Sequence, residues 1–280
     1  HPLMPDGGVA WELSTVKLQN GNYYVMGPAT GERLIEEWLR AREGRFADLQ
    51  LRNVTAKWGS LVIAGPKARD LLQTLSDADV SNEAFPWFTG QEISVAGVPL
   101  RALRMNFVGE LGWELHHPIE HQRQLYDALI SAGQEFSLRH FGLRAMDSMR
   151  MEKAYPIWGP ELNTEFSVLQ SNLGGFVKLD KGDFEGLEAV AVEKAKGPSH
   201  RLILLDVQPG EADAMGSEPV FDGDEIIGQT SSGAYGYRLN KSLALAFVRA
   251  DKAANGTQLS VEILGVRKSA TVSARCLYDP

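Results

Sequence analysis

The sequence has little of what disulfide-bonded, cysteine-metal or membrane proteins require. It contains a single cysteine, Cys276, which excludes an internal disulfide framework and a zinc site built from cysteines. No apolar run approaches the roughly 20 residues that cross a bilayer. The first residues, HPLMPDGG, lack the basic and apolar regions of a secretory signal. We therefore expect no membrane association and a cytoplasmic location, or the mitochondrial matrix if the source is a eukaryote.

Positive charge is also scarce. The chain has 28 Lys and Arg residues against 36 Asp and Glu residues, a net charge of −8, so its average surface repels a polyanion and we expect no nucleic-acid partner. The 44% apolar and 23% charged residues are typical of a globular protein. A chain of 280 residues can form one large domain or two smaller ones.

Common cofactor and hydrolase signatures are missing too. There is no G-x-G-x-x-G between a strand and a helix, no P-loop and no G-x-S-x-G, and the string GAYGY lacks the required spacing. His116, His117 and His121 are close in sequence, but the first two point to opposite sides of a predicted strand. We expect no metal site there, only a solvated strand end before a helix.

The pattern along residues 1–197 mixes strands and helices, which predicts an α+β body. An Asn-Gly turn between VAWELSTVKL and YYVMG indicates a hairpin, and residues 93–115 read as further strands. Leu34, Ile35, Trp38 and Leu39 share one face of a predicted helix over 30–43. Further helices are expected over 67–75, after Pro118 and over 142–154.

The pattern changes near residue 197. Five short β-like segments follow, with turn residues between them at the spacing of a small barrel or sandwich. We predict two domains, an α+β body over 1–197 and a C-terminal β-barrel module over 198–280.

Two carboxylates interrupt the apolar string NFVGELGWEL, residues 106–115. Glu114 fits an alternating strand and can simply be solvated. Glu110 follows Gly109 on a predicted backbone bend, where a carboxylate can point into a cleft and receive a ligand. Gly-Glu is also ordinary turn chemistry, so both interpretations stay open.

Three other charged residues are candidates for a functional site. Glu12 follows the Gly7-Gly8 pair in the first predicted strand and is either a solvent-facing residue or an acid of a site. Arg150, between methionines, either pairs with a buried carboxylate or binds an anionic ligand. Glu152 beside it is expected in an ion pair at the surface or between helices.

Six strings in register resemble the glycine-cleavage T-protein (aminomethyltransferase) family, and most closely the C-terminal module of dimethylglycine and sarcosine dehydrogenases. They run through nearly the whole chain in the family's order: GGVAWELSTVKL, VIAGPKARDLLQTL, NFVGELGWELHHP, GLRAMDSMRMEKAYPIWGPEL, FVKLDKGDFEG and GQTSSGAYGYRLNKSLALAFV. The family's N-terminal strand–helix unit has no counterpart among these strings, so we expect the body to be shortened at its N-terminus. The iron–sulfur-maintenance branch of the fold is not expected, because Asp183 stands where those relatives carry a cysteine.

The resemblance implies a tetrahydrofolate site and no flavin in this chain. It assigns Glu110 to the pterin ring, because an ionised carboxylate accepts both parallel N–H groups of a pterin edge. Arg150 and Trp158 would line the same cavity, and Tyr237, with Tyr235, would close one side. The implied reaction moves a methylene unit from an oxidised N-methyl amine to tetrahydrofolate, giving 5,10-methylenetetrahydrofolate. A flavoprotein domain or subunit would perform the oxidation.

The chain departs from the family pattern at the catalytic carboxylate. Relatives usually carry Asp a few residues after the Gly-Gly pair, and here the residue is Glu12. Other departures are Gln170-Ser171 in place of Glu-Ala and Phe107 in place of Tyr. Two alternatives therefore remain: a non-catalytic folate-binding or assembly module of a flavoprotein amine dehydrogenase, and a folate-dependent methyltransferase or demethylase.

Overall fold

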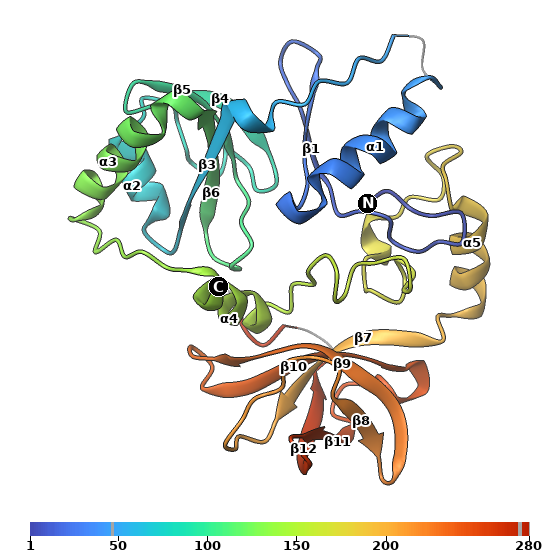
Figure 1. Ribbon diagram of the computed structural model, residues 1–280. Coiled ribbons are helices and arrows are strands. Elements are labelled where there is room, and N and C mark those ends of the chain that lie inside the picture. Colours follow the sequence, from blue (N-terminus) through green and yellow to red (C-terminus); the bar gives the residue numbers. More distant parts are fainter. Residues whose placement is uncertain (46–47, 274–275, 280) are drawn as a thin grey trace. The chain divides into compact units, whose positions relative to one another are not determined.

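The computed structural model describes residues 1–45, 48–273 and 276–279 (Figure 1). Its contacts divide the chain into two compact units, which are described separately. The first unit joins His1–Leu13 to Gly142–Pro280, and the second comprises Ser14–Phe141. No helix among the described residues is both long and apolar enough to cross a membrane.

The unit Ser14–Phe141 is built on a four-stranded antiparallel sheet of order β3-β6-β5-β4. The strands are β3 (Trp58–Ala64), β4 (Gly90–Val95), β5 (Val98–Leu103) and β6 (Gly112–Pro118). A separate hairpin, β1 (Ser14–Lys17) and β2 (Tyr23–Met26), is closed by the expected turn with Gly21 at φ 82°. The helices are α1 (Glu32–Glu43), α2 (Ala68–Thr74) and α3 (Gln122–Gly133).

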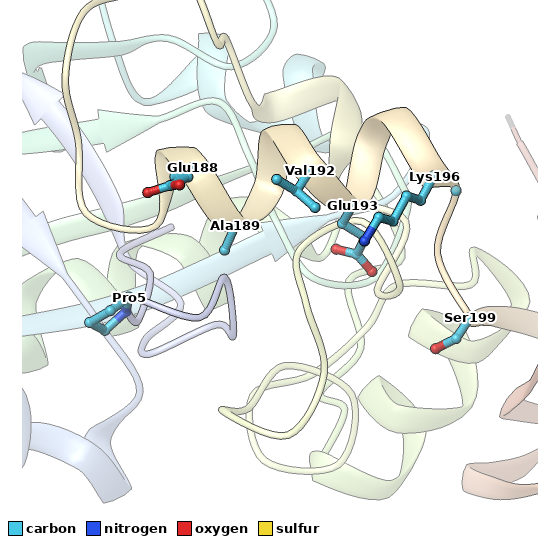
Figure 2. A pocket seen from close by; sticks show the side chains of 8 residues that line it. Pro5, Glu188, Ala189, Val192, Glu193, Lys196 and Ser199 are labelled. Carbon is cyan, nitrogen blue, oxygen red and sulfur yellow. The ribbon is translucent and has the colours of Figure 1, made fainter.

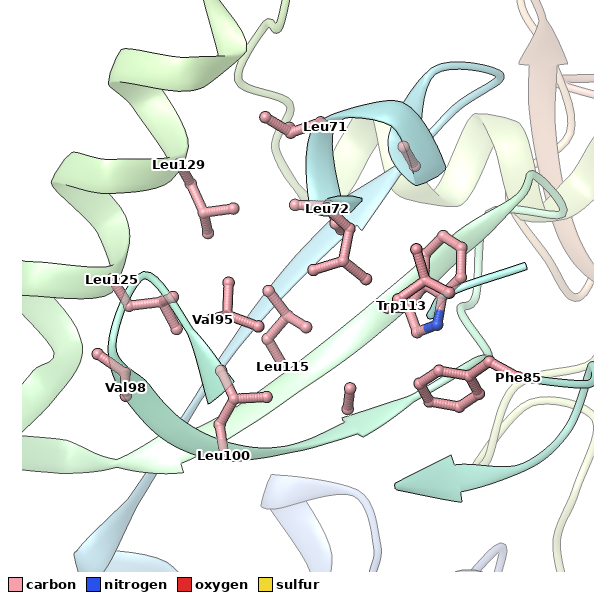
Figure 3. Close-up of a cluster of buried hydrophobic side chains, with 14 residues drawn as sticks. Leu71, Leu72, Phe85, Val95, Val98, Leu100, Trp113, Leu115, Leu125 and Leu129 are labelled. Atoms are coloured by element: carbon pink, nitrogen blue, oxygen red, sulfur yellow. The ribbon is translucent and has the colours of Figure 1, made fainter. Parts of the chain in front are cut away.

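One face of this sheet packs against α2 and α3. Trp113 and Leu115 of β6 alternate toward that face, and Figure 3 shows them among Leu71 and Leu72 of α2 and Leu125 of α3. These side chains are almost fully buried. Their burial fixes the strand register, which places the start of β6 and the loop before it at one end of the inner strands of the sheet.

The opposite face carries Glu114 and His116. Both histidines of β6 are buried, so the expected solvated strand end is wrong. His116 bonds the Glu114 carboxylate at 3.0 Å and the Tyr24 hydroxyl at 3.2 Å, whereas His117 bonds Gln122 at 2.8 Å. The polar partners explain the burial.

Helix α1 differs from its prediction in one residue. Ile35 is buried as expected, but Leu34 is 55% exposed and does not lie on the buried apolar face of the helix.

The other unit contains the predicted barrel, which is closed and six-stranded, of order β10-β7-β12-β11-β8-β9. Its strands are β7 (His200–Val207), β8 (Pro219–Asp222), β9 (Glu225–Gly236), β10 (Lys241–Arg249), β11 (Gln258–Ile263) and β12 (Val266–Ser273). Gly228 of β9 allows the close pairing with β10, because a Cβ there would lie 2.0 Å from the Phe247 oxygen.

Among the described residues, the barrel's unit also contains the α-helices α4 (Leu143–Glu152) and α5 (Leu187–Lys196). The N-terminal residues pack with the long segment between these helices and with α5: Leu3 and Val9 share a buried cluster with Leu162 and Val168 of the segment and with Val190 of α5. The first strand begins at Ser14. The sequence pattern had predicted a strand that begins at Val9, and this prediction is wrong. The predicted boundary near residue 197 remains a prediction; α5 ends at Lys196 and β7 begins at His200.

Candidate functional site

Glu110 lies in the loop between β5 and β6, on the bend that the glycine predicted. Gly109 has φ 70°, in the left-handed region that favours glycine. The Asn106 side chain accepts a hydrogen bond from Val108 N–H at 2.9 Å and donates one to the Glu110 carbonyl at 2.7 Å. Val108 is buried, and Glu110 is half-buried. The loop therefore holds the backbone of Glu110 in one position.

Gly112, two residues further on, is required by packing. A Cβ at this position would lie 2.4 Å from the Ile63 oxygen and 2.9 Å from Asn106 Nδ2. Any larger residue would displace either β3 or the asparagine that fixes Glu110. The two glycines thus serve different structural roles. Gly109 allows the backbone bend, and Gly112 allows β6 to approach β3 closely.

Glu12 and Trp158 belong to the unit that contains the barrel. Trp158 stacks on Trp11, the neighbour of Glu12, with ring centroids 5.0 Å apart and planes at 20°. Glu12 is half-buried and precedes β1 by two residues, so it lies outside the strand in which it was expected. The indole Nε1 of Trp158 is buried and has no hydrogen-bond partner among the described residues. A buried donor of this kind is available to a ligand.

The loop that carries Trp158 is tightly closed. Gly159 has φ 105°, and its N–H donates to the Leu162 oxygen at 2.9 Å. The Asn163 side chain donates to the Gly159 oxygen at 2.7 Å. The loop geometry therefore fixes the direction in which the indole leaves the backbone.

Arg150 is almost fully buried at the end of α4. Its Nε donates to Asp147 at 2.7 Å, and its Nη1 donates to the Tyr155 oxygen at 3.1 Å and lies 3.5 Å from the Glu161 carboxylate. The guanidinium therefore pairs with a buried carboxylate, the first of the two roles considered for it. No described residue forms a hydrogen bond with its Nη2. The Nη2 amino group could therefore donate a hydrogen bond to a ligand.

Glu152 is not in the surface or inter-helix ion pair that its neighbours suggested. It is buried, and its carboxylate accepts hydrogen bonds from the backbone N–H groups of Arg238 at 2.8 Å and Leu239 at 3.2 Å. It thus caps the turn between β9 and β10. Tyr237, in the same turn, is 80% exposed and meets Tyr235 edge to face, with centroids 5.1 Å apart.

Glu161 was not predicted as a site residue, and it is fully buried. Its carboxylate accepts hydrogen bonds from Ser232 Oγ at 2.6 Å and from Ile157 N–H at 2.9 Å. A Glu between Pro160 and Leu162 gives no periodic signal; only its place in the string shared with the family could have marked it.

Other candidate sites do not involve the predicted residues. No group of three or more potential metal ligands occurs among the described residues. A hollow of about 580 Å³ lies along α5 and is lined by Pro5, Glu188, Ala189, Val192, Glu193, Lys196, Gly197 and Ser199 (Figure 2). None of these residues was predicted to bind or react, and the hollow is wide open to solvent.

The fold has a close match among solved structures. The crystal structure of the glycine cleavage system aminomethyltransferase T from Bartonella henselae superposes with a TM-score of 0.84 over 99% of this chain and 74% of that chain, at 21% identity. The fold is thus that of an aminomethyltransferase, an α+β body with a closed C-terminal barrel, as predicted.

Family models assign the chain more narrowly. The GCVT N-terminal domain matches residues 2–181, and the glycine cleavage T-protein C-terminal barrel domain matches residues 200–279. The chain belongs to the glycine cleavage T-protein family, a family of folate-dependent aminomethyltransferase-like enzymes. The predicted family is confirmed.

The relatives fall into two groups. Human mitochondrial dimethylglycine dehydrogenase is 38% identical over 276 residues, which are 97% of this chain and 32% of that protein. The aminomethyltransferase of Caldanaerobacter subterraneus is 31% identical over 273 residues, 98% of this chain and 72% of that protein. The chain thus spans about a third of the length of the dehydrogenases it resembles.

Proposed function

We propose that the chain transfers a one-carbon unit to tetrahydrofolate. The unit is the methylene group of an oxidised N-methyl amine, delivered as an iminium ion or as formaldehyde, and the product is 5,10-methylenetetrahydrofolate. Membership of the glycine cleavage T-protein family supports this proposal, as do relatives named aminomethyltransferase and dimethylglycine dehydrogenase.

The observation that carries the proposal is the rigid loop at Glu110. A pterin presents two parallel N–H donors, and a carboxylate that accepts both must be held in one orientation before binding. Asn106 and Gly109 hold the backbone from which the Glu110 carboxylate extends, which supports such an arrangement. Gly112 keeps the adjoining strand close without a side chain. The proposed role of Glu110 is to hold the pterin edge.

In the other unit, two donors without a hydrogen-bond partner among the described residues are proposed to bind the folate. Arg150 Nη2 and the buried Trp158 Nε1 are available to polar atoms of the ligand. Trp158 also offers an aromatic ring, already stacked on Trp11 on one side. We propose that Arg150 and Trp158 contact the folate, and that the exposed ring of Tyr237 covers it.

Glu12 is proposed to manage the proton of the reaction. When a folate nitrogen attacks an iminium carbon, one C–N bond forms, and closure by the second nitrogen expels the amine and releases one proton overall. With formaldehyde, the two C–N bonds form and the oxygen leaves as water. A half-buried carboxylate can accept the proton from the attacking nitrogen and return it to the leaving group.

The source of the one-carbon unit is proposed to be a flavoprotein. The relatives named dimethylglycine dehydrogenase are about three times longer than this chain. An amine-oxidising flavoprotein domain or subunit would supply the iminium ion, and this chain would supply the folate site without binding flavin itself.

The experiment mixes formaldehyde and tetrahydrofolate with the chain and follows the formation of methylenetetrahydrofolate. We expect a rate above the spontaneous reaction, and a lower rate in the variant Glu12→Gln, which keeps the shape of the side chain but cannot accept the proton. Glu12→Asp tests the reach of the acid, since a misplacement on the order of 1 Å can change a rate roughly a hundredfold. Saturable folate binding without any acceleration would instead support a non-catalytic folate-binding module.

A further inference from the structure

We infer that Glu161 is a positioning residue that sets the orientation of both Arg150 and Trp158. The inference rests on the proposed function for its effect on folate, but its effect on Trp158 can be measured without a ligand. Glu161 is completely buried, and its two carboxylate oxygens have different partners. Oε2 makes the contacts with the Trp158 loop and with Arg150, whereas Oε1 accepts the Ser232 hydroxyl.

The oxygen Oε2 connects Glu161 to the loop of Trp158. It accepts the N–H of Ile157, the residue directly before Trp158, at 2.9 Å. On the other side of Trp158, the Gly159 N–H bonds the Leu162 oxygen. The backbone of Trp158 is thus held on both sides, which leaves its indole facing Trp11.

The same oxygen lies 3.5 Å from Arg150 Nη1, while Asp147 bonds Nε of the guanidinium. These two carboxylates have different surroundings. The Glu161 side chain is 0% exposed and that of Asp147 is 43% exposed, so water screens the Asp147 interaction far more strongly. We therefore take Glu161 as the less screened of the two carboxylates that hold Arg150, and no described residue forms a hydrogen bond with Nη2.

The oxygen Oε1 accepts the hydroxyl of Ser232 from β9 of the barrel, at 2.6 Å. In addition, the Ser171 hydroxyl donates to the main-chain oxygen of Glu161 at 3.0 Å. These bonds attach Glu161 to the rest of its unit and do not reach Arg150 or the Trp158 loop. They offer a control, because one bond to the same carboxylate can be removed without touching either proposed target.

The test compares Glu161→Gln with Ser232→Ala. In the ligand-free chain, we expect the stacked pair Trp11–Trp158 to give an exciton couplet in the far-ultraviolet circular dichroism, and Trp158→Phe identifies its part of the spectrum. We expect Glu161→Gln to lose most of this couplet and Ser232→Ala to keep it. With tetrahydrofolate, we expect the dissociation constant of Glu161→Gln to rise roughly tenfold or more, the size of a lost hydrogen bond to a charged group, and that of Ser232→Ala to change little.

If Glu161→Gln does not fold, the double variant Arg150→Met, Glu161→Met replaces the buried pair by apolar groups, an exchange that proteins often tolerate. The inference then requires loss of the couplet in the folded double variant. An unchanged couplet and an unchanged folate affinity would overturn it. If the parent binds no folate, the proposed function fails, while the couplet still decides whether Glu161 positions Trp158.

Discussion

The replacement Asn106→Ala probes the loop on which the pterin-binding proposal depends. It removes the hydrogen bond to the Glu110 carbonyl at 2.7 Å and the one from Val108 N–H at 2.9 Å. Each bond contributes about 0.5–1.5 kcal/mol, so the bend loses about 1–3 kcal/mol. If the loop then opens in the ligand-free chain, the apparent dissociation constant of tetrahydrofolate rises by roughly 5- to 150-fold.

Isothermal titration calorimetry measures this change, with thermal unfolding as a second readout. Asn106→Asp keeps the acceptor for Val108 but sets a carboxylate against the Glu110 carbonyl, so we expect it to resemble Asn106→Ala. The control is Asn53→Ala in the same unit, which loses the bond from Thr55 N–H at 2.9 Å and the bonds to Glu36 at 2.8 Å and Glu32 at 3.2 Å. A melting temperature lowered in both variants, with folate affinity unchanged in both, would refute the reasoning.

Two further predictions concern stability. Trp113 is fully buried in the core around β6, so Trp113→Ala should lower the free energy of unfolding by about 3–5 kcal/mol. The side chain of Trp87 is 66% exposed, so Trp87→Ala should change this free energy by at most about 0.5 kcal/mol. Equal losses of the two variants in urea titrations would contradict this assignment of the core. For Glu218, burial raises the pKa, but hydrogen bonds from Thr230 and from the N–H groups of Met215 and Gly216 outweigh it, so the pKa lies below its ordinary 4.5. A carboxyl with a lowered pKa stabilises the fold above pH 4.5, and this contribution is lost as the pH falls through the folded pKa. The free energy of unfolding should therefore depend less on pH in the acid range in Glu218→Gln than in the parent chain. An unchanged acid dependence would count against this account of the loop.

Much of the architecture could be predicted because it depends on local patterns. The Asn-Gly turn fixes the β1–β2 hairpin, and the alternation along β6 separates Trp113 and Leu115 from Glu114. The short, turn-separated segments after residue 197 are the strands of the closed barrel. Glycine chemistry also predicted the bend at Gly109.

What could not be predicted depends on contacts between distant segments. Glu152 is buried because it caps a turn more than 80 residues away, and Glu161 is buried because Ser232 lies across from it, 71 residues along the chain. Neither contact leaves a periodic trace in the sequence. The late start of β1 has the same origin, since Leu3 and Val9 pair with each other and pack on Leu162.

The most direct test of the central claim compares two carboxylates of one string. Titration of tetrahydrofolate into Glu110→Gln and Glu114→Gln separates the proposed pterin ligand from a carboxylate that pairs with His116. Glu110→Gln loses one charged, bidentate contact, so its affinity for tetrahydrofolate should fall by roughly tenfold or more. The affinity of Glu114→Gln should change little. Binding by Glu110→Gln with the affinity of the parent chain would contradict the account.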